Sequence, residues 1–303
     1  MKVSPLHLLR QGPVLATLAR TVVADLMPGR TGGGEVQAPG EEHTDRVPPR
    51  SPELVRDYVR HVGGDPSWYR GRLPFHLFPQ WGVPILARTL QGLPYELVKV
   101  MNAGCAVTVH RELPLDRPLV LRARLERVDA DERRVVLYQR LVTGTDEHPV
   151  AQVVEQRAII KLAARGSSRA PRERPGVPAP AREVGRFRVG PGAGLDFAVL
   201  TGDLNPLHWL GAYARASGHR GPILHGFSTL ARAVEVLNRN LWAGDPARLG
   251  WIEVRFTRPL PVPTEVGVYI TDAEGGIGLH VGKMAGGPAY LTGRLRTKEP
   301  SDG

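Results

Sequence analysis

The sequence predicts an α+β protein in which one unit, a long buried helix wrapped by an antiparallel sheet, occurs twice. The chain of 303 residues is long enough for two such units. Two segments rich in proline, glycine and arginine, about 28–50 and 164–183, show no hydrophobic period, so we expect mobile connections there. They separate a first block, 51–163, from a second block, 184–298, and the two blocks resemble each other.

Three groups of residues carry the similarity between the blocks, in the same order in each. Gly64-Asp65 is matched to Gly202-Asp203, and Gly82, which precedes a Leu-Ala-Arg triplet, is matched to Gly226, which precedes another. A spaced Val, Pro, Leu and Pro also recurs, as Val109, Pro114, Leu115 and Pro118 and as Val254, Pro259, Leu260 and Pro263. Self-similarity of this kind indicates a duplicated structural unit.

The second block alternates between two hydrophobic periods. After Gly226, apolar residues at helical spacing predict a buried helix of about 15 residues. Gly275-Gly276 and Gly286-Gly287 predict hairpin turns between the strands that follow. The expected strands are 250–257, 264–271, 278–284 and 289–297.

The first block follows the same plan, with its helix expected near 83–93 and its strands near 106–111, 118–128, 134–142 and 150–162. Residues 1–50 are expected to form an amphipathic helix that lies on the body of the protein, followed by a mobile linker. Arg10 and Arg20 interrupt any signal-peptide core in that helix.

Composition narrows the classes of partner and location. The formal charge of +10 suits an anionic partner. The basic residues do not cluster, so we do not expect nucleic acid to be that partner. Without an apolar run of membrane-spanning length, we expect no membrane span and a cytoplasmic protein. The single cysteine, Cys105, excludes an internal disulfide and is expected to be buried in a strand.

A carboxylate and an imidazole, Asp203 and His208, lie five positions apart in the second block. Pro206 suits the first position of a helix, so Asn205 is expected to cap a helix that ends near Gly218. Both side chains can then face one cleft with a water between them, where such a pair can take and return a proton. The alternative is that Asp203 and Asn205 only cap the helix and that His208 packs against the protein as a structural residue.

His225-Gly226 opens the long helix. The start of a helix leaves backbone N–H groups free and carries the positive end of the helix dipole. A glycine there lets a carbonyl oxygen approach, and an oxygen that gains negative charge would be stabilised by these groups. The alternative is a tight turn before a buried helix.

The segments Phe197–His208 and Pro222–Phe227 resemble the signature of the MaoC-like (R)-specific enoyl-CoA hydratases and 3-hydroxyacyl-thioester dehydratases. The similarity covers about 187–240 and implies the hotdog fold of that family. The first block resembles the degenerate N-terminal hotdog of the double-hotdog members. The expected fold is therefore a double hotdog.

The resemblance also implies a reaction: reversible hydration of a trans-2-enoyl thioester to a (3R)-3-hydroxyacyl thioester, carried by coenzyme A or an acyl carrier protein, in fatty-acid or polyketide-type metabolism. Asp203 and His208 would be the catalytic pair, and the Gly226 amide would hold the thioester carbonyl. No cofactor and no metal is implied. The expected substrate contacts are Asn205, His225 and Phe227.

The first block departs from the family pattern. It keeps Gly64-Asp65 but has no histidine at the matching place, and Trp81 stands where His225 stands in the second block. We therefore expect the first block to supply half of the sheet and to shape the acyl tunnel without performing chemistry. A homodimer of whole chains is left open.

Two other functions compete with hydration. A hotdog acyl-thioesterase would use an acidic residue to activate water at the carbonyl carbon, but hydrolysis does not require the Asn-Pro-x-His segment. A non-catalytic acyl-binding or partner subunit is the third reading, because Leu204, Leu207 and Trp209 make the motif region apolar.

Overall fold

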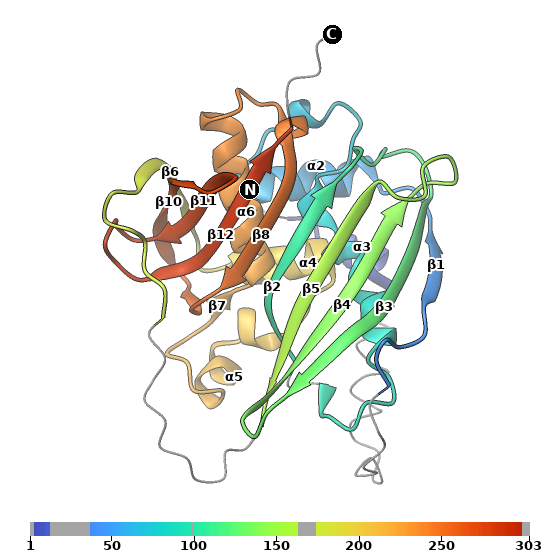
Figure 1. Cartoon of the computed structure of the whole chain (residues 1–303). Helices are drawn as coiled ribbons and strands as arrows, with labels where there is room; N and C mark the ends of the chain where they lie inside the picture. Colours follow the sequence, from blue (N-terminus) through green and yellow to red (C-terminus); the bar gives the residue numbers. More distant parts are fainter. Residues whose placement is uncertain (1–2, 13–36, 98–99, 163–173, 299–303) are drawn as a thin grey trace.

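The computed structural model describes residues 3–12, 37–97, 100–162 and 174–298 (Figure 1). Ten strands form one antiparallel sheet in the order β1-β3-β4-β5-β2-β8-β12-β11-β10-β6. The first five in sequence are β1 (His43–Val47), β2 (Met101–Val109), β3 (Leu119–Ala130), β4 (Arg134–Gly144) and β5 (Gln152–Lys161). The others are β6 (Arg182–Val189), β8 (Leu249–Phe256), β10 (Thr264–Ala273), β11 (Gly276–Gly282) and β12 (Ala289–Thr297). A short pair, β7 (Ile223–Leu224) and β9 (Leu260–Pro261), lies apart from this sheet.

The strand order shows that the chain is built from two equivalent halves. From the centre outwards the first half runs β2-β5-β4-β3-β1, and the second half runs β8-β12-β11-β10-β6, which is the same succession. The halves join where β2 pairs antiparallel with β8, with Ala106 opposite Glu253. The predicted α+β architecture, a repeated unit of sheet and helix, is therefore confirmed.

Helices from both halves cover one face of this sheet, behind the strands in Figure 1. The predicted long helix of the second half is α6 (Gly226–Asn240), whose 15 residues include an unbroken buried run from Phe227 to Asn238. Its counterpart α3 (Pro79–Arg88) has 10 residues and begins and ends earlier than predicted. Proline at the first helical position fixes that start, because its ring presets the backbone angle and its missing N–H is not needed there.

The earlier start of α3 changes how the two halves correspond. Phe78, not Trp81, stands immediately before the helix as His225 does before α6. Trp81 lies inside α3, is 1% exposed and donates from Nε1 to Thr143 Oγ1 at 3.3 Å. Similarly, Asp65 caps the turn η2 (Pro66–Tyr69) as Asn205 caps η5 (Pro206–His208). Asp65 is thus the structural counterpart of Asn205.

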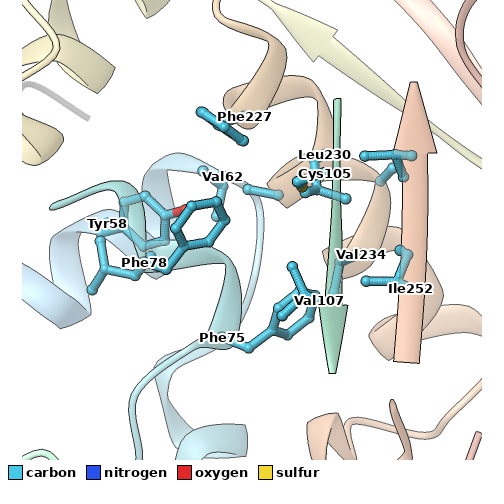
Figure 2. Close-up of a cluster of buried hydrophobic side chains, with 14 of the residues drawn as sticks. Tyr58, Val62, Phe75, Phe78, Cys105, Val107, Phe227, Leu230, Val234 and Ile252 are labelled. Atoms are coloured by element: carbon cyan, nitrogen blue, oxygen red, sulfur yellow. The ribbon is translucent and has the colours of Figure 1, made fainter. Parts of the chain in front are cut away.

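The largest cluster of buried hydrophobic side chains includes residues of both halves (Figure 2). The rings of Phe78 and Phe227 meet edge to face at 5.1 Å between centroids, across the two halves. Cys105 and Val107 of β2 lie among these apolar side chains with Leu230 of α6. Cys105 is 1% exposed within β2, which confirms the expectation of a buried cysteine in a strand, and this burial raises the pKa of its thiol to about 12.

A group of polar side chains also joins the halves in the interior. The Glu235 carboxylate of α6 accepts from Tyr69 Oη at 2.5 Å, lies 3.1 Å from His76 Nε2 and accepts from Asn238 Nδ2 at 3.0 Å. Gly64 packs so closely that a Cβ there would lie 2.5 Å from the carboxylate. Burial and the neighbouring Glu235 hold the pKa of Tyr69 well above its usual range, so the phenol remains a donor. These bonds compensate a carboxylate that is 1% exposed.

The boundaries of the expected linkers need correction. β1 lies inside the segment 28–50 that was expected to be a mobile connection, and it pairs with β3 as an edge strand. In the second expected linker, β6 starts at Arg182, and Val177 before it donates to Gly287 O at 2.8 Å and so already packs on the second half. Of the expected N-terminal helix, the described part is the 3-10 helix η1 (Pro5–Gln11). The rest of it, and residues 163–173 of the second linker, lie outside the described residues.

Among the described residues, no helix is long and apolar enough to cross a membrane.

Removing the buried carboxylate should destabilise the whole molecule, because the groups that face it would lose their acceptor. We expect Glu235→Leu to lower the free energy of unfolding by about 3–5 kcal/mol. Urea denaturation followed by circular dichroism measures this. Glu147→Leu, which breaks the exposed pair with Arg117, is the control and should leave the midpoint nearly unchanged. A wild-type midpoint for Glu235→Leu would contradict the structural role assigned to Glu235.

Candidate active site

The loop that carries Asp203 begins at the end of α4 (Ala193–Thr201). Gly202 ends that helix with a left-handed φ of 84°, a conformation that favours glycine. Asn205 caps the single 3-10 turn η5, and its Oδ1 accepts from Leu207 N at 3.1 Å. Asp203 thus lies just before a short capped turn and His208 is the last residue of that turn, as predicted from the Asn-Pro pair.

The helix predicted to run from Pro206 to about Gly218 is interrupted, and this expectation was wrong. The chain leaves η5 through Trp209 (φ −143°) and an extended Leu210, and then forms a separate helix, α5 (Gly211–Ala216). Trp209 Nε1 donates to Leu204 O at 3.2 Å. The indole therefore ties the chain back onto the loop, which a continuing helix would not allow.

The hydrogen bonds of His208 define its free nitrogen. Nδ1 lies 2.8 Å from Ile223 O in β7. A carbonyl oxygen only accepts, so Nδ1 carries the proton in the neutral ring and Nε2 keeps a lone pair. A ring nitrogen of His208, one of His225 and a carboxylate oxygen of Asp203 all lie within 4.8 Å of one another. That spacing suits a water molecule held between the Asp203 carboxylate and an imidazole base.

His225 supports both members of this pair. Its ring stacks on His208, with centroids 3.6 Å apart and planes 29° from parallel. Its Nε2 lies 3.0 Å from the backbone oxygen of Asp203, to which it donates, and 3.9 Å from Asp203 Oδ2. Burial, together with the nearby His208, lowers the pKa of His225 to about 3, although Asp203 opposes the shift. His225 is therefore neutral near pH 7.

The three side chains are close enough to be considered as metal ligands. A chelated ion needs lone pairs that converge on one point. The His208 and His225 rings are nearly parallel, and one nitrogen of each already lies against a carbonyl oxygen. For His225 the nitrogen that keeps a lone pair is Nδ1, which is buried without a hydrogen-bond partner, so the Nε2 that faces Asp203 has no lone pair to offer a metal and the three side chains do not fit a metal site.

Gly226 begins α6 directly after His225, so the N–H groups of the first helical turn lie next to the histidine pair. Besides leaving room for a ligand carbonyl, the glycine is needed here for packing. A Cβ at position 226 would lie 2.6 Å from the Phe256 ring, so the close packing of α6 against that ring requires glycine.

The three expected substrate contacts occupy different environments. Asn205 is half-buried and its side chain caps η5. His225 is 2% exposed and faces the Asp203 loop. Phe227 is 3% exposed and packs between Phe78 and Phe256. The sequence did not indicate that the His225 ring would stack on His208, because no local pattern encodes the side-chain direction of a residue before a helix.

Comparison with known proteins gives this geometry a family context. The model of the MaoC like domain matches residues 180–286. The 3-hydroxyacyl-thioester dehydratase X of Mycobacterium tuberculosis is 26% identical over 208 residues, which cover 67% of this chain and 70% of the relative. A probable enoyl-CoA hydratase 2 of Dictyostelium discoideum is 23% identical over 189 residues, which cover 60% of this chain and 64% of the relative.

Solved structures agree on the fold. HtdX of M. tuberculosis superposes with a TM-score of 0.68 and 20% identity, covering 85% of this chain and 100% of that one. Another M. tuberculosis protein, described as a double hotdog, gives a TM-score of 0.57 and 16% identity over 86% of this chain and 96% of that one. The chain has the double-hotdog fold, and the region that matches the model of the MaoC like domain, residues 180–286, lies in its second half.

Proposed function

We propose that the protein is a hydro-lyase that adds water reversibly to a trans-2-enoyl thioester and forms a (3R)-3-hydroxyacyl thioester. The observation that carries this proposal is the pairing of Asp203 with a His208 whose Nδ1 is fixed by Ile223 O, which leaves Nε2 as a base. General acid–base catalysis needs a proton-accepting group held within hydrogen-bond reach of the proton that it removes.

In the hydration direction, a water held between the Asp203 carboxylate and His208 Nε2 gives a proton to the imidazole as its oxygen bonds to C3. The electron pair of the double bond moves toward the thioester, which becomes an enolate with negative charge on its carbonyl oxygen. The free N–H groups at the start of α6, beginning with Gly226, stabilise this charge. The imidazolium then returns a proton to C2, and dehydration is the reverse.

His225 acts as a positioning residue in this scheme. It donates to the backbone of Asp203 and stacks on His208, so it fixes the carboxylate and the base relative to each other. Because its pKa is lowered to about 3, it adds no positive charge beside His208 when the base is at work. A charged neighbour would disfavour the imidazolium that the reaction forms.

The carrier of the acyl group is coenzyme A or an acyl carrier protein. Both are anionic, and the net charge of +10 favours either. The names of the two relatives, a hydroxyacyl-thioester dehydratase and an enoyl-CoA hydratase, support a thioester substrate. We retain the cytoplasm as the proposed location, and a homodimer as a further proposal.

The test of the activity is incubation with crotonyl-CoA, followed by the loss of enoyl absorbance. We expect hydration by the native chain and a fall in kcat of roughly 10²–10⁴-fold for Asp203→Asn and for His208→Gln, since each removes a proton-handling group. His110→Gln, an exposed histidine, is the control. Release of coenzyme A without hydration would indicate a thioesterase, and neither product would indicate a non-catalytic subunit.

Two histidines should make the protein sensitive to acid. Burial and the nearby His208 lower the pKa of His225 to about 3, and burial and the nearby Arg232 lower the pKa of the half-buried His61 to about 3. An unfolded histidine titrates near 6.5, so between about pH 6.5 and 3 the unfolded state binds more protons and stability falls as the pH falls. Each histidine adds a slope of about 1.4 kcal/mol per pH unit in that window.

Urea denaturation at a series of pH values would measure this slope. His225→Phe keeps a ring against His208 but cannot take up a proton. In this variant the slope of the free energy of unfolding against pH, between about pH 6.5 and 3, should therefore decrease by about 1.4 kcal/mol per pH unit, which corresponds to one proton. His110→Gln should leave the slope as it is. Parallel curves for the native chain and His225→Phe would show that His225 is not the buried titrating group.

A further inference from the structure

The end of α4 leads directly into the Asp203 loop, and its backbone carbonyls need partners because the helix stops there. Phe197 O accepts from Thr201 Oγ1 at 2.8 Å, and Ala198 O accepts from Gly202 N at 2.7 Å. The next two carbonyls, of Val199 and Leu200, have no later helical turn to bind them.

Gln11 supplies the missing donors from the other end of the chain. Its Nε2 donates to Val199 O at 3.2 Å and to Leu200 O at 2.9 Å. The residue is the last of η1 and is 0% exposed. A buried amide that bridges two carbonyls completes the cap of α4 in a way that no residue near α4 in sequence does.

The orientation of the Gln11 amide is itself fixed by the first half. Gln11 Oε1 accepts from Gln80 Nε2 at 3.2 Å, and Gln80 Oε1 accepts from Arg50 Nη1 at 2.9 Å. Gln80 lies in the first turn of α3. Because its oxygen must face Gln80, the Gln11 amide presents its nitrogen to the α4 carbonyls.

The loop that follows is anchored locally at Leu204, whose N donates to Gly202 O at 2.9 Å and whose O accepts from Trp209 Nε1 at 3.2 Å, whereas the neighbouring amides of Asp203 and Asn205 have only weak local acceptors. Asp203 N lies 3.4 Å from Thr201 Oγ1, and Asn205 N lies 3.4 Å from Asp203 Oδ1, both of which are long for hydrogen bonds. The position of the carboxylate therefore depends on where α4 ends and on the bond from His225.

We propose that Gln11 is a positioning residue of the active site: by capping α4 it sets the place from which Asp203 reaches the water between itself and His208. This rests on the proposed hydratase function. The described N-terminal residues, packed on α4 and tied to α2 (Pro52–His61) through His7 Nε2 and Asp57 Oδ2 at 2.9 Å, then belong to the support of the site. A shift of about 1 Å in a catalytic group can cost up to 10²-fold in rate.

The experiment compares Gln11→Met, which keeps the volume but has no N–H donor, with Leu9→Ala. Leu9 lies in the same 3-10 helix but is 82% exposed, so it is a matched control. Two quantities are measured in the full chain: amide hydrogen exchange of residues 202–208, which does not depend on activity, and kcat and KM with crotonyl-CoA.

For Gln11→Met we expect exchange of the 202–208 amides to become about tenfold faster while the α6 amides keep their rates. We expect kcat to fall about tenfold or more, with KM changed less than about twofold. Gln80→Leu, which frees the Gln11 amide to turn, should show both effects to a smaller extent. Leu9→Ala should show neither.

The outcomes separate this proposal from the proposed activity. Native exchange in the loop of Gln11→Met, or faster exchange in every element alike, would overturn the positioning role. So would a rise in KM at unchanged kcat. If the native chain hydrates no enoyl thioester, the proposed function fails, and faster exchange confined to the loop would still support the placement of the loop by Gln11.

Discussion

The pairing of β2 with β8 is the contact on which the other features of the molecule depend. Five residue pairs, from Gly104 opposite Arg255 to Thr108 opposite Trp251, join the half-sheets into one. Because the strands are antiparallel, the second half repeats the first in reversed direction, and both helical layers lie on the same face. The polar contacts of Glu235 and the cap on α4 connect those layers and presuppose this alignment.

The alignment gives the first half more than a share of the sheet. It contributes His76 and Tyr69 to the carboxylate of α6, and Gln80 to the amide that caps α4. The matching turn of the first half offers Asp65 as a cap and no imidazole, so it carries no equivalent acid–base pair. Through Gln80 it holds the Gln11 amide that caps α4, the helix that leads into the Asp203 loop.

The sequence predicted best where a local pattern carried the information. The start and length of α6 followed from Gly226 and a helical apolar period, and four second-half strands, β8, β10, β11 and β12, followed from the turns between them. The edge strand β6 was not predicted. β1 was missed because an edge strand of four consecutive polar residues and one valine has no apolar face to detect. α3 was displaced because Gly82 was taken as its start, whereas Pro79 is.

In the candidate site, too, a local sequence pattern indicated some residues, whereas other contacts depend on the tertiary structure. Asp203 and His208 could be recognised because the Asn-Pro turn that separates them is written in eight consecutive residues. The stack of His225 on His208 and the bonds from Gln11 could not, because Gln11 reaches carbonyls 188 and 189 positions away. Contacts over such distances are decided by packing, and no short window of the sequence records them.

The chain's single thiol is enclosed between β2 and α6, with its pKa raised to about 12. A thiol held protonated in the core is a poor nucleophile, so we expect it not to react with maleimides or mild oxidants. A cysteine introduced on the surface would then be the one reactive handle, and a fluorophore could be attached there without first removing the native residue. The protein is thus ready for single-site labelling of the loops around the site.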